Sequence, residues 1–544
     1  MLPLLDVASR LGLSSDDLIP FGRDKAKIDR AVLTRPRASA TPAKLVLVSA
    51  ITPTPAGEGK TTTSIGLSDA LTLLGHRATA VLREPSLGPC FGVKGGGTGG
   101  GRSRLSPSDD INLHFNGDFH AITSAHNLLA AAIDNCVHFG TAPGLDARRV
   151  LWRRVIDMND RSLRNIVVGL GGETNGTPRE AGFDITAASE LMAMLCLADD
   201  ADDLRRRIDR TLVGFDRSGA PVTAGALGVT GAMLALLRDA LLPNLVQTEQ
   251  GTPAIVHGGP FANIAHGCNS VIATRTGLKL ADWVVTEAGF GFDLGAEKFF
   301  DIKCRSAGFD PDAVVLVATA RALKMHGGVA LDAINRPDPA GVAAGLPNLE
   351  KHLESVARFG KPAVVALNRF GSDTDEELAV VAEACAKRGV GVAVCEHFGR
   401  GGEGALELGR QVIAAVDKGG ARFEPLYPLE ASIPAKIEAV ARAMYGARGV
   451  AFTKSAERDL KDIDKLGYGN LPICVAKTQN SLSDDPKLRG RPRDFEITVR
   501  GLQINAGAGF IVVLTGELMR MPGLPKVPAA AKIDLQDGTI VGLS

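Results

Sequence analysis

The segment Thr52–Thr63, which reads TPTPAGEGKTTT, carries the strongest sign of chemistry in the sequence. It follows a run of β-branched residues typical of a buried strand, and it begins a helix-like stretch. Glycine and lysine in this context indicate a phosphate-binding loop, because successive backbone N–H groups and a helix N-terminus bind phosphates. Lys60 would add a positive charge, and the hydroxyl of Thr61 or Thr62 could hold Mg²⁺. Thr54 replaces the first glycine of the usual pattern, so a plain loop before a helix cap is the alternative to an ATP site.

Charged residues follow the next expected strand, Ala78–Leu82. In an open α/β sheet, ligands gather beyond the carboxyl ends of the parallel strands. Arg83 could therefore stabilise a phosphoryl group in transfer, and Glu84 could orient Mg²⁺ or a substrate. A surface ion pair at the strand end is the alternative. The glycine-rich run Lys94–Gly101 is either a flexible loop or an anion-binding nest.

Three histidines lie in segments dense in polar side chains. His114 and His120 flank Asp118 without the spacing of a zinc site, and buried, hydrogen-bonded histidines are an equally good explanation. His257 directly follows the expected strand Ala254–Val256, and there a site and a core position are about equally favoured.

Two phenylalanines follow the ends of neighbouring expected strands. Phe370 comes after the strand that ends at Asn368, and Phe398 comes after the strand that ends at Val394. Aromatic rings at adjacent strand ends can enclose a flat heterocycle between them. Each phenylalanine taken alone is more often a core residue.

The elements that must position these residues alternate between short apolar strands and helix-like segments. This alternation indicates an α/β fold with mainly parallel sheets, and parallel strands buried on both faces should be continuously apolar, as these are. The expected strands are Leu45–Ile51, Ala78–Leu82, Asn165–Val168, Ala254–Val256, Trp283–Val285, Ala313–Val317, Ala363–Leu367 and Val390–Val394. Stretches rich in proline, glycine or polar residues at Asn335–Leu349 and Glu424–Pro428 are candidate domain boundaries.

Composition excludes several classes of protein. The chain has 544 residues with 61 basic and 61 acidic side chains, so no overall positive field favours nucleic acid as a partner. Its eight cysteines include no CxxC pair, which indicates reduced thiols. No secretory signal is apparent and no apolar run reaches the ~18 residues of a membrane helix, so we expect a cytoplasmic protein without a membrane partner. Glycine, with 63 residues, is well above its usual share of ~7%.

A series of longer motifs resembles one family. TPTPAGEGKTTT, REPSLGP, DINLHFNGDFHAI, HGGPFANIAHGCNS, DLGAEKFFDIKCR, ATARALKMHGG, GRGGEGA and KTQNSLSDDPKLRGRP follow one another as in the formate–tetrahydrofolate ligases. The resemblance extends from Pro20 to the carboxyl terminus. It implies that ATP, formate and tetrahydrofolate give 10-formyltetrahydrofolate, ADP and phosphate through formyl phosphate.

The same resemblance implies roles for individual residues. Arg83, beside Glu84, would bind formyl phosphate. His114, His120 and His257 would lie close to the reacting groups. Phe370 and Phe398 would stack on the pterin ring. Glu84, Thr61 and Thr62 are the expected Mg²⁺ ligands. The residues expected to contact ATP are Thr54, Pro55, Ala56, Gly57, Glu58, Gly59, Lys60, Thr61 and Thr62.

The sequence also departs from the family's pattern. Phe398 stands where members commonly carry Trp, Arg102 and Asn480 where Tyr is common, and Phe292 where Ala is common. Phe292 would add bulk to a glycine-rich turn.

Further expectations come from the resemblance alone. These are a homotetramer, activation by a monovalent cation (K⁺ or NH₄⁺), and a large phosphate-loop NTPase-like domain followed by two smaller α/β domains. We place the three at residues 1–350, 351–445 and 446–544, the second contributing the folate-stacking loops.

Two other functions stay open on the residues alone. One is an ATP-dependent ligase that activates another carboxylate as an acyl phosphate, although the Phe370 and Phe398 pair favours a flat heterocyclic acceptor. The other is a phosphate-loop ATPase that switches partner proteins, although Pro55 stands where such switches often carry an extra lysine.

Overall fold

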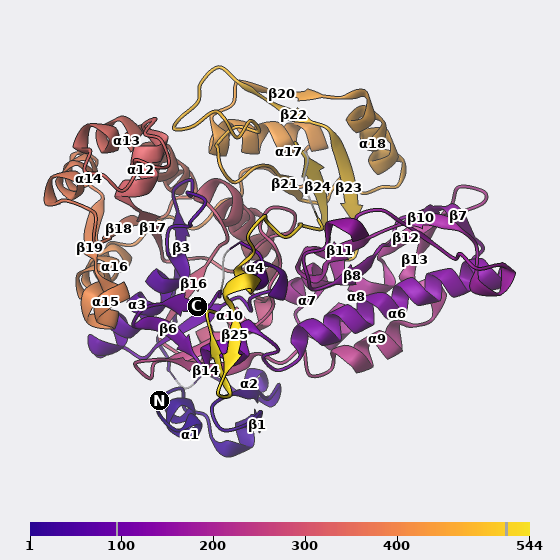
Figure 1. Ribbon diagram of the computed structural model, residues 1–544, viewed down its shortest axis with the longest axis horizontal. Helices are drawn as coiled ribbons and strands as arrows, with labels where there is room; N and C mark the ends of the chain where they lie inside the picture. Colours follow the sequence, from indigo (N-terminus) through magenta and orange to yellow (C-terminus); the bar gives the residue numbers. More distant parts are fainter. Residues whose placement is uncertain (38, 94–95, 517–519, 544) are drawn as a thin grey trace.

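A computed structural model describes residues 1–544 except 38, 94–95, 517–519 and 544. Its centre is a large, mainly parallel sheet with helices on both faces (Figure 1), so the expected α/β fold is confirmed. The parallel strands, in spatial order, are β15 (Pro253–Val256), β4 (Ala78–Leu82), β16 (Trp283–Glu287), β3 (Lys44–Ala50), β17 (Ala313–Ala318), β18 (Ala363–Asn368) and β19 (Gly391–Cys395).

Antiparallel strands extend the β15 side of this sheet. They are β14 (Asn244–Thr248), β2 (Ala26–Ile28) and β1 (Leu18–Pro20), with β6 (Ser103–Ser106) pairing with β14 and β5 (Gly99–Gly100) pairing with β6. Small helices precede and follow β1 and β2, namely α1 (Leu4–Ser9) and α2 (Ala31–Thr34).

Side chains alternate between the two faces of the central strands, as the pleat requires. In β3, Leu45 and Leu47 belong to the core beneath one helical layer, whereas Val46 and Val48 belong to the core beneath the other. The first layer contains α10 (Val271–Leu280), α12 (Ala320–His326), α13 (Pro339–Arg358) and α14 (Asp375–Lys387). The second contains α3 (Lys60–Leu73) and α16 (Leu406–Lys418).

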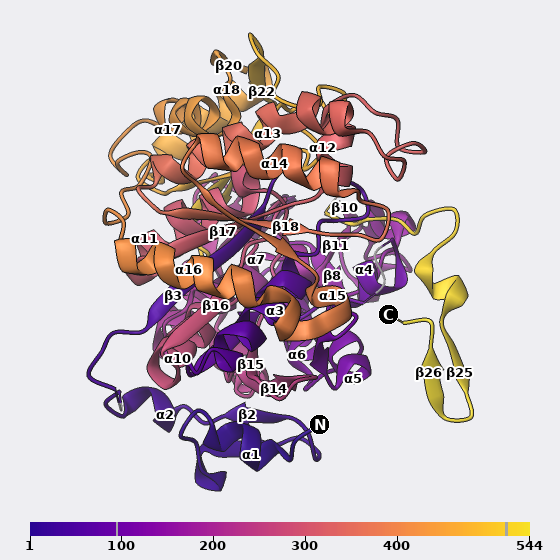
Figure 2. The same cartoon turned by 90° about the vertical axis from the view of Figure 1, so that its left-hand side faces the viewer.

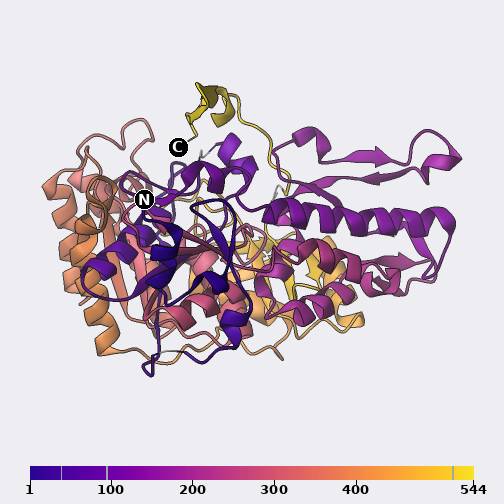
Figure 3. The same cartoon turned by 90° about the horizontal axis from the view of Figure 1, so that it is seen from below.

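An elongated arm leaves the sheet on the right of Figure 1 and is seen lengthwise in Figure 3. It is built on α6 (Asp118–Phe139), with α7 (Glu190–Leu197), α8 (Ala201–Asp209) and α9 (Thr230–Leu237). Its strands are β7 (Leu145–Val150), β8 (Arg154–Ile156), β9 (Ile166–Val168), β10 (Arg179–Ala181), β11 (Phe183–Ile185), β12 (Leu212–Asp216) and β13 (Pro221–Thr223). The expected strand Asn165–Val168 is therefore not part of the large sheet, since β9 pairs antiparallel with β10.

A carboxyl-terminal unit packs above the junction of sheet and arm (Figure 1). It contains α17 (Ile433–Val440), α18 (Lys454–Lys465), β20 (Gly449–Phe452), β21 (Ile473–Ala476), β22 (Glu496–Val499), β23 (Gly501–Asn505) and β24 (Phe510–Leu514). The hairpin of β25 (Asp534–Gln536) and β26 (Thr539–Val541) projects from the body in Figure 2.

The division into domains at 350 and 445 stays a prediction. Strands β18 and β19, which lie in the expected second domain, pair in one sheet with β17 of the first. No helix within the described residues combines the length and the apolar character that a bilayer crossing requires.

Candidate active site

The loop between β3 and α3 is fixed by its own side chains. Gly57 and Gly59 have φ of +80° and +78°, a left-handed backbone that favours glycine. Glu58 is buried, and one carboxylate oxygen accepts a hydrogen bond from the backbone N–H of Thr54 at 2.6 Å. Its other oxygen accepts from the hydroxyl of Thr319, which directly follows β17. Glu58 therefore holds the shape of the loop, and its expected contact with a nucleotide stays a prediction.

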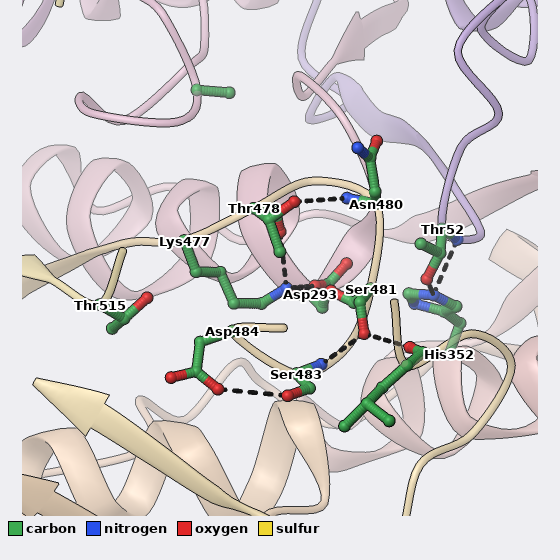
Figure 4. Close-up of polar contacts among 12 residues, drawn as sticks. Thr52, Asp293, His352, Lys477, Thr478, Asn480, Ser481, Ser483, Asp484 and Thr515 are labelled. Carbon is green, nitrogen blue, oxygen red and sulfur yellow. Dashed lines mark hydrogen bonds and ion pairs between the residues drawn. The ribbon is translucent and has the colours of Figure 1, made fainter. Parts of the chain in front are cut away.

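The start of the same loop is held by two buried histidines. His326 Nε2 donates to the carbonyl of Thr52 at 2.8 Å, and its Nδ1 accepts from the backbone N–H of Gly490 at 3.1 Å. His352 Nε2 accepts from the N–H of Thr52 at 3.0 Å, as Figure 4 shows. Burial lowers the pKa of His352 to about 4 and also lowers that of His326. Both rings are therefore neutral at pH 7, which these hydrogen bonds require.

A loop of the carboxyl-terminal unit approaches this position. Lys477, at the start of the loop, forms a buried ion pair of 2.9 Å with Asp293 (Figure 4). Further along, the carbonyl of Gly490 accepts from Asn348 Nδ2 at 2.8 Å. The same Asn348 amide donates to the hydroxyl of Thr52 at 3.1 Å. The carboxyl-terminal unit thus supports the start of the loop between β3 and α3.

Glu287, the last residue of β16, brings two neighbouring strand ends together. The hydroxyl of Thr61 donates to Glu287 Oε2 at 2.9 Å. The Arg83 guanidinium, which follows β4, lies 3.9 Å from Glu287 Oε1 and also donates to the carbonyl of Pro260 at 3.2 Å. Lys60 is the first residue of α3, beside Thr61. Thr61, at the start of α3, and Arg83 therefore converge on one carboxylate at the carboxyl end of the sheet.

Glu84 points into a buried polar network next to Arg83. Burial raises the pKa of Glu84 well above its usual value, and the Asp118 carboxylate adds to the rise. Asp118 forms a 2.7 Å ion pair with buried Lys27 and accepts from Asn244 Nδ2 at 2.8 Å. One carboxyl oxygen of Glu84 has no hydrogen-bond partner among the described residues. Burial therefore disfavours the charged form of Glu84, and one of its carboxyl oxygens stays without a partner in the described part of the chain.

The two expected stacking residues differ in their surroundings. The Arg321 guanidinium lies 3.5 Å from the ring centroid of Phe370, so one face of that ring is already covered by a cation. Phe398 is 63% exposed, and its carbonyl accepts from the N–H of Arg102 at 2.8 Å. A Cβ on Gly100 would approach the Phe398 ring to 3.0 Å, so the glycine run lies directly against this aromatic side chain. Lys94 and Gly95 of the same run lie outside the described residues.

The family of the chain follows from its similarity to known proteins. The family model described as "Formate--tetrahydrofolate ligase" matches residues 1–544. A curated protein of that name from Hyphomonas neptunium is 56% identical over 543 residues, covering 100% of this chain and 98% of the relative. A second from Granulibacter bethesdensis is 55% identical over 545 residues, covering 100% and 95%. This chain belongs to the formate–tetrahydrofolate ligase family.

His257 directly follows β15 at the carboxyl end of the sheet, and its backbone N–H donates to the carbonyl of Leu82 at 3.1 Å. His257 is fully buried, with Nδ1 2.6 Å from the hydroxyl of Ser270 and Nε2 2.7 Å from the carbonyl of Ala240. Burial lowers its pKa to about 4. Both ring nitrogens are occupied, which favours the alternative of a satisfied core histidine. His114 and His120 are exposed on either side of the start of α6, and their roles near the reacting groups stay predictions.

The residues that depart from the family's pattern lie in different environments. Phe292 is fully buried and packs with Phe300 and Phe359, with ring centroids 6.2 and 6.1 Å apart. It therefore fills an aromatic core rather than obstructing a turn. Arg102 is exposed next to Phe398, and Asn480 is half-buried on the loop that follows Lys477 (Figure 4).

Three residues of this edge were not among the sequence candidates. Glu287 joins Thr61 and Arg83, and Asn368 Nδ2 donates to the carbonyl of Glu58 at 2.9 Å. Both end strands of the sheet, so the rule that pointed to Arg83 could have found them. His266 is fully buried, and neither ring nitrogen has a hydrogen-bond partner among the described residues. Burial and the nearby Lys303 cation hold its pKa well below the usual value, a property without a local sequence signal.

Proposed function

We propose that this chain joins formate to tetrahydrofolate at the expense of ATP, at the carboxyl edge of the large sheet. The observation that carries the proposal is the convergence of Thr61 and Arg83 on Glu287. A triphosphate bound along the loop and the N-terminus of α3 would end close to that point. The family membership of the whole chain supports the same reaction.

Two transfers make up the reaction. A formate oxygen attacks the γ-phosphorus of ATP, the bond to the ADP oxygen breaks, and formyl phosphate forms. The folate amine then attacks the formyl carbon, the carbon–oxygen bond to phosphate breaks, and the amine loses a proton. Phosphorylation is needed because the oxygen of a free carboxylate is a poor leaving group.

Positioning and positive charge supply the catalysis in this proposal. Both steps concentrate negative charge, so preorganised cations and N–H groups stabilise their transition states. Lys60 would contact the terminal phosphates from the helix N-terminus. Arg83 is partly fixed by the carbonyl of Pro260, and its guanidinium would hold formyl phosphate between the two steps.

Phe370 and Phe398 would receive the pterin ring of tetrahydrofolate. Because Arg321 covers one face of Phe370, the heterocycle would use the other face. Phe398 would supply the second surface from the end of β19, with a smaller ring than the family's usual Trp.

Magnesium would enter with ATP. The Thr61 hydroxyl and the Glu287 carboxylate are the oxygen donors that Mg²⁺ prefers, and they already lie 2.9 Å apart. Burial raises the pKa of Glu84, which disfavours the carboxylate form that would bind the ion, and its expected role as a ligand stays a prediction. No cluster of three or more His, Cys, Asp or Glu side chains suited to a metal occurs in the described part of the chain. We also propose, from the family alone, a cytoplasmic homotetramer activated by K⁺ or NH₄⁺.

Product analysis tests the proposal. With ATP, formate and tetrahydrofolate present, the enzyme should form 10-formyltetrahydrofolate and release ADP in equal amounts. Acetate or bicarbonate in place of formate should give no product. ADP release that does not depend on formate would instead support a nucleotide switch, and release with a different carboxylate would support another ligase.

A further inference from the structure

A cavity lies between the arm and the carboxyl-terminal unit, and no residue of the loop between β3 and α3 lines it in the described part of the chain. Its volume is about 340 Å³, within the size range of small-molecule sites. Three arginines line it, Arg207, Arg210 and Arg305, together with Tyr468. No acidic side chain lines the cavity in the described part of the chain.

Arg207 and Arg210 lie at the end of α8 and are held by backbone carbonyls. Arg207 Nη1 donates to the carbonyl of Ala508 at 2.9 Å. Arg210 Nε donates to the carbonyl of Ala506 at 2.9 Å, and its Nη2 donates to that of Gly507 at 3.0 Å. A carbonyl orients a guanidinium without neutralising it. Arg210 thus keeps its full charge, and no carboxylate pairs with it among the described residues.

The turn at residues 506–508, whose carbonyls bind these arginines, is itself held by buried contacts. Glu190 Oε1 accepts from the N–H groups of Gly507 and Ala508 at 2.8 and 3.2 Å. A Cβ at Gly507 would lie 2.2 Å from the hydroxyl oxygen of Thr211, so only glycine fits. The guanidinium groups are therefore preorganised by buried scaffolding instead of extending into solvent.

Arg305 is the third arginine that lines the cavity. Its Nη2 donates to the carbonyl of Tyr427 at 2.8 Å and contacts Asp301 at 3.2 Å, and its side chain is only 15% exposed. Arg207 Nε lies 2.8 Å from the carboxylate of Asp203, and Asp203 does not line the cavity. Each of the three arginines retains one terminal nitrogen that has no hydrogen-bond partner within the described residues.

The electrostatics of this arrangement favour an anion. Burial lowers the pKa of Arg210, and the positive charge of nearby Arg207 adds to this effect. A bound oxyanion would relieve this repulsion and accept bidentate hydrogen bonds from the planar guanidinium groups. Apolar side chains, Leu197, Ile302 and Leu429 among them, also line the cavity.

We infer that this cavity binds a small organic oxyanion, a carboxylate or phosphate ester with an apolar body. The anionic group would lie between Arg207, Arg210 and Arg305, and the apolar body would rest on Leu197 and Leu429. Such a ligand would join the arm to the carboxyl-terminal unit, which also supports the phosphate loop through Gly490. This inference does not depend on the reaction proposed above.

Phenyl phosphate and benzoate are suitable probes, read by hydrogen–deuterium exchange on the full-length protein. Phenyl phosphate should protect amides in 204–210 and 506–509, and comparing it with benzoate shows which oxyanion is preferred. Peptides covering 52–62 report separately on any binding at the phosphate loop. Protection confined to 52–62, or no protection at all, would overturn the inference.

Two variants and a matched control sharpen the test. Arg210→Gln should weaken probe binding at 506–509 at least tenfold, because it removes an unneutralised charge. Ser306→Asp, at an exposed residue that lines the cavity, places a negative charge there without removing any scaffold contact and should also abolish binding. Arg206→Gln, on the same helix but with its side chain 66% exposed and away from the cavity, should bind as wild type. Unchanged binding in Ser306→Asp would refute the site even where Arg210→Gln disturbs the turn.

Discussion

Replacing Lys477 with methionine tests how strongly one buried ion pair stabilises the packing of the carboxyl-terminal unit against the carboxyl edge of the large sheet. Lys477 is fully buried, pairs with Asp293 at 2.9 Å, and donates to the carbonyls of Thr478 and Ser481. Burial lowers its pKa, and the Asp293 carboxylate acts in the opposite direction. Lys477→Met keeps a similar volume but leaves Asp293 as a buried carboxylate without its cation.

The expected cost follows from the distance and the burial. At an effective dielectric constant of about 20, unit charges 2.9 Å apart attract by about 6 kcal/mol, and the desolvation of both groups offsets much of this. Removal of one partner is costlier than the net value of the pair, because the remaining charge stays buried. We expect Lys477→Met to reduce the free energy of unfolding by about 3–5 kcal/mol.

Urea denaturation followed by circular dichroism measures this cost. Combining Lys477→Met with Asp293→Asn removes the stranded charge and should recover much of the loss. The control Lys461→Met, at an exposed lysine of α18, should change stability by less than about 0.5 kcal/mol. The buried ion pair does not stabilise this unit if Lys477→Met has the same free energy of unfolding as the control. The same conclusion follows if adding Asp293→Asn lowers that free energy further.

Three further predictions concern catalysis and pH. Lys60→Ala should lower kcat for formate-dependent ADP release by about 10²–10³-fold with an unchanged circular dichroism spectrum, and near-normal turnover would remove Lys60 from the phosphate site. Phe398→Ala should raise the Michaelis constant for tetrahydrofolate by the equivalent of about 1–3 kcal/mol while that for ATP stays constant, and an unaltered folate value would place the pterin elsewhere. Burial raises the pKa of Glu190 from 4.5 to about 7, so the stability that its protonated form contributes is complete below pH 4.5 and is lost as the pH rises through 7. The free energy of unfolding of Glu190→Gln, relative to that of the wild type, should therefore increase by up to about 3 kcal/mol as the pH rises from 4.5 to 7. A difference between the unfolding midpoints of the two proteins that does not vary with pH would contradict this.

The order of elements along the carboxyl edge of the large sheet could be predicted from local sequence. The apolar run before Thr52 and the glycines and lysine after it specify a strand, a tight loop and a helix, and these are β3, the loop and α3. Because parallel strands place their carboxyl ends on one edge, the sequence also indicated that Arg83 and Phe370 follow strands of the same sheet. Its family motifs were confirmed over the whole chain.

Which side chains meet at this edge depends on contacts between residues that are distant in the sequence. Thr61 and Glu287 are 226 residues apart, and Thr52 and His352 are 300 apart, so no local pattern reports either contact. The same holds for His257, whose two ring nitrogens find partners in the interior, and for Phe292, which enters an aromatic core. Local backbone preference depends on near neighbours, whereas burial, pKa and hydrogen bonding depend on whatever the fold brings within a few ångströms.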